Sequence, residues 1–188
     1  MKNISYRVAL GGIVSALCLV TMFLAGIMPA LYLVLPMIAG ILMMIIAAEV
    51  NTKWALLTYV SVSILSMFIT FDKEAALIFI LLFGHYPILR IYIDKLRGRL
   101  LKFIVKLAVF NACIIVYFYT VVYIFGLKQM LEEFDDFGKY GAVIMLAISN
   151  FVLILYDKNL DACRVLYRKK LMPKFKKNKG IGKSAKSQ

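Results

Sequence analysis

The sequence predicts an all-α integral membrane protein, a six-transmembrane-helix bundle with N-terminus and C-terminus cytoplasmic. Three observations predict this class. Hydrophobic residues make up 63% of the 188 residues, and charged residues make up only 18%. The apolar residues come in runs of about twenty, the length that an α-helix needs to cross a bilayer. The basic residues gather between alternate runs, which is typical of cytoplasmic loops.

The first two spans are predicted from one long apolar segment. Residues 8–48 contain no charge, and they are about twice as long as one span requires. Pro29 and Pro36 divide this segment. Because proline breaks helical hydrogen bonding, we place the spans at about 8–28 and 33–50. The segment is much longer than the apolar core of a signal peptide, so we expect no cleavage.

The fourth span contains the most informative local interruption. It follows an Asp-Lys-Glu turn and is predicted at about 75–93. Gly84 and Pro87 interrupt it, and its uncharged part is short for a bilayer. We therefore expect it to continue past Arg90, with that side chain snorkelling to the interface.

The remaining spans lie between polar or charged segments. We predict them at about 54–71, 103–125 and 140–156. The membrane domain then covers 1–171, and the basic tail 172–188 is predicted to be disordered in the cytoplasm.

Charge asymmetry predicts the orientation. With the N-terminus inside, the inner side carries 20 basic and 4 acidic residues, and the outer side carries 3 basic and 6 acidic residues. This distribution indicates a multi-pass protein of a bacterial-type cell membrane. It also explains the net charge of +13 without nucleic acid, which we do not expect as a partner. The basic cytoplasmic face is expected to attract anionic lipids or a partner, or to act as a topology anchor only.

The sequence gives little support for catalysis. It has one histidine, no G-x-S-x-G elbow and no Walker A loop. The three cysteines show neither metal spacing nor a disulfide framework. We therefore expect no enzyme activity, no metal and no cofactor, and any use of ATP must come from a partner.

One face of the first span is made of small residues. On a helical wheel Ala9, Gly12 and Ala16 share a side with Gly11 and Ser15. Small residues let another helix approach closely, which drives association in lipid. The face is either an interface for a partner or a packing surface within the chain.

The size, the six spans, the topology and the small residues at Ala9, Gly12 and Ala16 resemble the substrate-binding S components of energy-coupling factor (ECF) transporters. The resemblance implies that this face meets a transmembrane T component, that two cytoplasmic ATPases drive the cycle, and that the S component topples in the membrane. It also implies uptake of a small organic ligand, a vitamin or related micronutrient.

The same resemblance implies a ligand site that opens outward. It would lie between the connection 29–36, the turn 70–74, the outer ends of the last three spans and the loop 126–139. Its candidate contacts are Tyr32, Thr70, Asp72, Glu74, Tyr119, Tyr123, Glu132, Glu133, Asp136 and Tyr140. Aromatic side chains near an interface are otherwise bilayer anchors, and acidic side chains in an outer loop are otherwise simply solvated.

Three polar residues are predicted inside the membrane: His85, Asn111 and Asn150. Polar groups at this depth normally face the bundle and bond to each other. An ionisable one is a functional candidate by default. We predict an interhelical clasp, with a proton relay or a ligand contact at His85 as the alternatives.

Two other functions stay open. The first is a non-transport membrane scaffold of envelope or cell-shape machinery (MreD-like), which would hold partners through its helix faces and have no ligand pocket. The second is a small autonomous transporter or channel, with the three polar residues on a water-filled path.

Overall fold

A computed structural model of the chain describes residues 4–124, 141–167 and 169, and these residues form helices and short connections without a strand. With the interrupted fourth helix taken as one, the described residues form six helices. Five of them are long and apolar enough to cross a membrane. The predicted all-α class is therefore confirmed. The basic tail 172–188 lies outside the described residues.

The N-terminal half packs around α2. Its elements are α1 (Ile4–Ile27), the short η1 (Pro29–Leu31), α2 (Val34–Glu49) and α3 (Thr52–Ile69). At 16 residues, α2 is about 24 Å long, which is short for a bilayer. Helix α2 packs against α1, α3, the fourth helix and α8, so it lies inside the bundle. Its buried residues include Ala39, Gly40 and Met43.

The fourth helix consists of α4 (Lys73–Ile78), the π-helical turn η2 (Phe79–Phe83) and α5 (Tyr86–Ile93). We call these three elements the broken helix. Asp72 caps the start of α4, since its carboxylate accepts from the backbone N–H groups of Glu74 at 2.9 Å and Ala75 at 3.3 Å.

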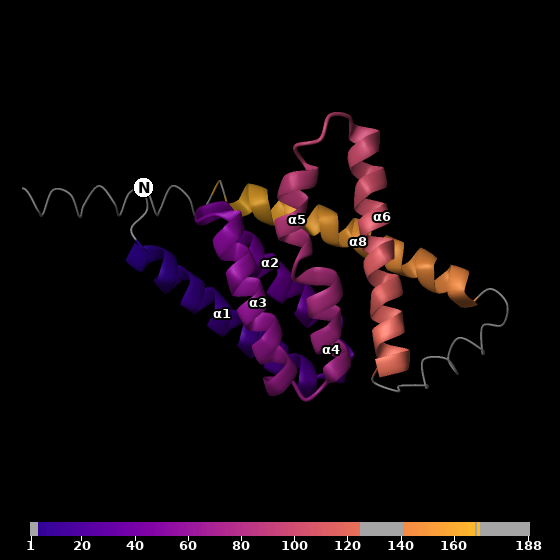
Figure 1. The fold of residues 1–188 in the computed structure, drawn as a ribbon, viewed down its shortest axis with the longest axis horizontal. Coiled ribbons are helices and arrows are strands. Elements are labelled where there is room, and N and C mark those ends of the chain that lie inside the picture. Colours follow the sequence, from indigo (N-terminus) through magenta and orange to yellow (C-terminus); the bar gives the residue numbers. More distant parts are fainter. Residues whose placement is uncertain (1–3, 125–140, 168, 170–188) are drawn as a thin grey trace, which may run out of the picture.

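The C-terminal half contains α6 (Arg99–Tyr119), the π-helical turn η3 (Thr120–Ile124) and α8 (Gly141–Leu166). Helix α6 begins directly after Gly98, whose φ of 100° favours glycine. Helix α8 continues well past the predicted end at residue 156. In Figure 1, α8 crosses behind α6, and its N-terminal half extends beyond the other helices. That half is apolar and exposed, as at Val143 and Phe151.

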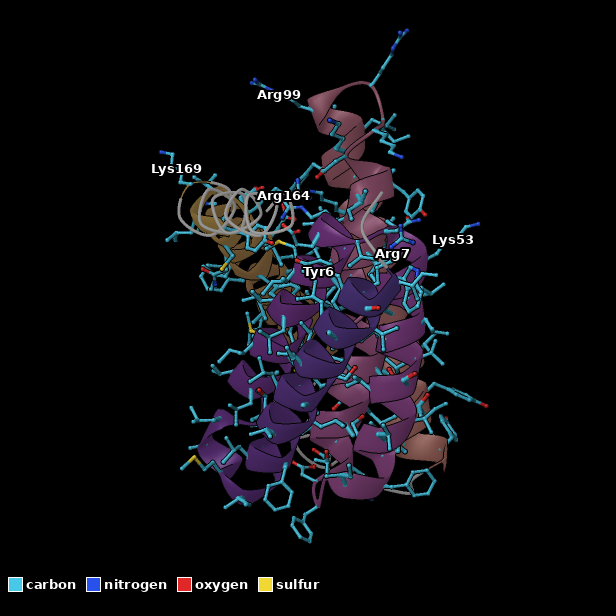
Figure 2. The ribbon with its side chains drawn as sticks, turned by 90° about the vertical axis from the view of Figure 1, so that its left-hand side faces the viewer. Tyr6, Arg7, Lys53, Arg99, Arg164 and Lys169 are labelled. Carbon is cyan, nitrogen blue, oxygen red and sulfur yellow. The ribbon has the colours of Figure 1, made fainter. Side chains whose placement is uncertain are left out.

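Basic side chains from four helices gather toward one end of the bundle. Figure 2 shows Arg7, Lys53, Arg99, Arg164 and Lys169 in the upper part of the view. They come from both ends of the sequence and from two helices between them. The fold therefore collects at one end the charges that the sequence assigns to the cytoplasmic side, and we refer to it as the basic end.

Candidate functional site

The broken helix leaves two carbonyl oxygens without their usual helical donors. The Gly84 N–H donates to Phe79 O at 2.6 Å, five residues back instead of four, so Ile80 O loses its normal donor. Pro87 has no N–H, so Phe83 O loses its donor as well. Since a buried carbonyl without a donor is costly, both oxygens require side chains or water.

Side chains of two other helices bond to these oxygens. The hydroxyl of Tyr156, on α8, donates to Phe83 O at 3.1 Å. The hydroxyl of Tyr59, on α3, donates to Ile80 O at 2.7 Å, and His85 Nδ1 lies 3.3 Å from the same oxygen. The interruption is therefore a junction in which α3 and α8 are hydrogen-bonded to the broken helix.

Two glycines make room for this junction. A Cβ on Gly40 would lie 2.6 Å from Phe83 O and would also clash with the Tyr156 hydroxyl. A Cβ on Gly84 would lie 2.8 Å from Tyr59 Cε2. Glycine at both positions lets α2 and α3 approach the broken helix closely enough for the two tyrosines to reach its backbone.

The predicted intramembrane cluster separates into two pairs. The Asn150 amide donates to Asn111 Oδ1 at 3.2 Å, and the Asn111 amide donates to Leu107 O at 3.0 Å. The half-buried His85 instead has its Nε2 3.5 Å from the sulfur of Cys113. Helices α6 and α8 are thus joined by the two asparagines, and no hydrogen bond is described between them and His85.

A second polar group, which was not predicted from the sequence, lies at the basic end. It contains three basic and three acidic side chains. They come from α5, from Asp94 directly after α5, from α6 and from α8. We call it the charge cluster: Arg90, Asp94, Lys106, Asp157, Asp161 and Arg164.

Arg90 lies at the centre of the charge cluster and is only 3% exposed. Its Nε is 3.0 Å from Asp157 Oδ1, and its Nη2 is 2.6 Å from Asp161 Oδ1. The expectation that Arg90 snorkels to the interface is therefore wrong. Its guanidinium points into the bundle because two carboxylates of α8 meet it there, and a buried charge needs such partners.

The other members complete the charge balance. Lys106 Nζ is 2.9 Å from Asp157 Oδ2, and Arg164 Nη1 is 3.2 Å from Asp94 Oδ2. The hydroxyl of Tyr86 donates to Asp157 Oδ1 at 2.8 Å. With equal numbers of cations and anions, the charge cluster joins α5, α6 and α8 without a net charge of its own.

The sequence does contain a signal for the charge cluster. Arg90 and Asp94 are four residues apart, as are Asp157 and Asp161. Residues at this spacing lie on the same face of a helix. The two acidic residues follow an apolar run without a helix breaker, so continuation of α8 would place both carboxylates on one face.

The end of α8 contacts the end of α2 near the charge cluster. The hydroxyl of Tyr167 donates a short hydrogen bond to a carboxylate oxygen of Glu49. Burial and this hydrogen bond raise the pKa of Tyr167 above its usual value. The phenol therefore keeps its proton and remains a donor, which holds the two helix ends together.

Some of the predicted outward residues come together, and others do not. Tyr32, Asp72 and Glu74 lie close enough to the buried Tyr117 of α6 to act on it electrostatically. Thr70 is 1% exposed, and within the described part of the chain its hydroxyl oxygen has no hydrogen-bond partner. The end of the bundle opposite the basic end thus contains two buried polar side chains, Thr70 and Tyr117, from separate parts of the sequence.

Two further candidates point elsewhere. Tyr119 and Tyr123 stack on each other with ring centroids 4.6 Å apart and are 59% and 72% exposed. Such exposed rings are typical of bilayer anchors. Four candidates lie outside the described residues: Glu132, Glu133, Asp136 and Tyr140.

The predicted small-residue face of α1 divides in the structure, and three of its residues are turned away from the rest of the bundle. Ala9, Gly12 and Ala16 are all exposed, and a Cβ on Gly12 would meet nothing within 4 Å. Gly11 behaves differently, since its Cβ would lie 3.7 Å from Thr58 Oγ1. Helix α1 therefore packs within the chain through another side, and packing within the chain does not occupy these three residues.

Over the described ranges, no group of three or more His, Cys, Asp and Glu side chains is placed to hold a metal ion. By helix length and composition, the fold is that of a multi-pass membrane protein. Comparison of the chain with known protein families, curated proteins and solved structures finds no match.

Proposed function

We propose that the protein is the membrane-embedded substrate-binding subunit of an ECF-type importer. It captures a small organic nutrient from outside and docks on a transmembrane T component, which works with two cytoplasmic ATPases. The main support for the proposal is the exposed part of the small-residue face of α1, which we call the open face. Ala9, Gly12 and Ala16 lie on one side of the helix, near the basic end, and their own chain leaves them exposed.

The open face is suited to another helix. A Leu or Phe at these positions would hold a partner's backbone several ångströms away, whereas glycine and alanine allow close contact. The same helix is fixed within its own bundle by Val14, Cys18 and Met22, which are buried. One side of α1 therefore holds the subunit together, and the other side is available to the T component.

The outer end supplies a suitable place for the ligand. Tyr32, Asp72, Glu74 and Tyr117 come from four different elements or connections, and the first three lie within electrostatic range of Tyr117. Thr70 lies two residues before Asp72, and its buried hydroxyl lacks a partner among the described residues. A small polar organic molecule would satisfy this hydroxyl, as a bound water would.

The docking step is tested with a pair of substitutions in α1. Gly12→Leu and Ala16→Leu each place a large side chain on the open face, and each should abolish co-purification with a T component and two ATPases. Val20→Leu enlarges another exposed position of the same helix and should leave the complex intact. Survival of the complex in both test variants would contradict the proposed face.

Ligand binding is tested separately. Native mass spectrometry of the protein purified from its own host in mild detergent should show a small organic molecule bound to the subunit. Co-purification of envelope-synthesis proteins, in place of ATPases and a T component, would instead support the MreD-like scaffold.

A further inference from the structure

A groove lies between α3 and α5 at the basic end of the bundle. It has a volume of about 210 Å³. Its aqueous end is formed by Thr52, Lys53 and Tyr92, and Leu56, Ile88 and Leu89 line it further along, toward His85. We propose that this groove is a binding site for one anionic phospholipid of the inner leaflet, an inference that is independent of the proposed import function.

The groove matches the amphipathic character of a phospholipid, because it has charge at one end and apolar side chains along its length. Lys53 is exposed at the start of α3, and its side chain points away from the bundle in Figure 2. From Tyr92 to His85 the groove follows α5 for about 10 Å at 1.5 Å per residue. An acyl chain would cover Leu56 and Leu89 while the phosphate remains at the level of Lys53.

The charge at the aqueous end favours an anionic head group over a zwitterionic one. Lys95 Nζ lies 5.3 Å from the centre of the Tyr92 ring, so a second cation lies beside a residue that lines this end of the groove. Arg7 of α1, which packs against α3, lies at the same end of the bundle. Basic residues in such positions between membrane helices attract acidic lipid head groups.

The wall of the groove is held in place by hydrogen bonds. The hydroxyl of Tyr92 donates to Thr52 Oγ1 at 3.1 Å, and the Thr52 hydroxyl donates to Asn51 Oδ1 at 3.1 Å. These bonds fix the Tyr92 ring across the start of α3. Because the Tyr92 and Thr52 hydroxyls already donate their protons in these bonds, the Lys53 ammonium is the group that contacts the phosphate.

The test uses the full-length protein, delipidated in mild detergent and then given phosphatidylglycerol or phosphatidylcholine with the same acyl chains. Native mass spectrometry should show one retained phosphatidylglycerol and much less phosphatidylcholine. Lys53→Gln should weaken retention of phosphatidylglycerol about fivefold, the loss expected for one basic residue at an anionic surface. Leu56→Trp should reduce it further by filling the path of the acyl chain.

Lys158→Gln is the matched control, because it removes the same charge from an exposed position on α8, a helix that packs against α2 and α6. Retention of phosphatidylglycerol should be unchanged in this variant. A thermal-shift measurement gives a second readout: phosphatidylglycerol should raise the melting temperature of the wild type and the control, but not of the Leu56→Trp variant.

Three results would overturn the proposal. The first is equal retention of the two lipids by the wild type. The second is unchanged retention of phosphatidylglycerol in the Lys53→Gln or Leu56→Trp variant. The third is a dimer of the chain that Leu56→Trp dissociates, which would show that a second copy occupies the groove.

Discussion

Arg90 and Asp157 are 67 residues apart in the chain and form an ion pair of 3.0 Å between α5 and α8. The Arg90 guanidinium also donates to the backbone oxygen of Asp157 at 3.2 Å. This contact uses the backbone and the side chain of the same residue, so it specifies both the position and the rotation of α8 against α5.

Removal of either partner should destabilise the bundle. Arg90→Met leaves Asp157 with Lys106 as its cationic partner and Tyr86 as a hydrogen-bond donor. We expect a loss of about 3 kcal/mol in the free energy of unfolding, at the low end for a buried pair because Lys106 remains. Unfolding in mixed micelles with increasing SDS measures this loss. Arg97→Met, at an exposed position between α5 and α6, should have little effect.

The coupling within the pair gives a stricter test. The double variant Arg90→Met with Asp157→Leu should be less destabilised than the sum of the single variants, because neither charge is then left buried without its partner. Strict additivity would show that the two residues contribute independently and would contradict the assigned pair.

Gly40→Ala should destabilise the junction at the broken helix. The new Cβ would lie 2.6 Å from Phe83 O, so α2 must move away, and we expect a loss of about 1–3 kcal/mol from overpacking. Thermal unfolding in detergent measures it. Gly12→Ala is the matched control: its Cβ meets nothing within 4 Å, so stability should be unchanged or rise by up to about 1 kcal/mol.

Tyr156→Phe tests the hydrogen bond to the broken helix while keeping the buried ring. Phe83 O would lose the donor that replaces the missing Pro87 N–H, and we expect a loss of about 1–3 kcal/mol. Tyr59→Phe should have a smaller effect, since His85 Nδ1 remains 3.3 Å from Ile80 O. Equal effects of the two changes in an SDS titration would contradict this account.

Asn150→Ala tests the hydrogen-bonded contact between α6 and α8. Interhelical hydrogen bonds of this kind contribute about 0.6 kcal/mol on average and up to about 1.7 kcal/mol. Asn159→Ala is the control, because it makes the same change at an exposed position of the same helix and so cancels the difference in helix propensity. Two variants of equal stability would show that the Asn111 contact contributes nothing.

The local elements were predictable because they depend on local features. Prolines divide the first two apolar runs, and charged or polar turns bound the others. The ranges near 54–71 and 75–93 agree with α3 and the broken helix to within a few residues. Gly84 and Pro87 predicted the interruption of the fourth helix. The positions of apolar runs, turn residues and prolines were therefore sufficient to predict the helical class and the order of the helices.

The polar contacts were less predictable because they depend on the packing of distant segments. Arg90 follows an apolar run. If α8 ended at residue 156, as predicted, the Arg90 side chain would have no acidic partner on that helix and would extend to water instead. Only the continuation of α8 brings Asp157 and Asp161 to it. The partners of Phe83 O and Ile80 O likewise lie on other helices, and nothing near the interruption in the sequence identifies Tyr156 or Tyr59.

The members of the charge cluster are far apart along the chain, so during synthesis its ion pairs can form only in a fixed order. Arg90 is synthesised 67 residues before Asp157. While the ribosome is still making α6, the Arg90 guanidinium has only Asp94 to pair with among the acidic members of the cluster. Helix α8 thus neutralises the broken helix only after both have been made, and a nascent chain that stops before residue 157 contains Arg90 without the two α8 carboxylates that pair with it.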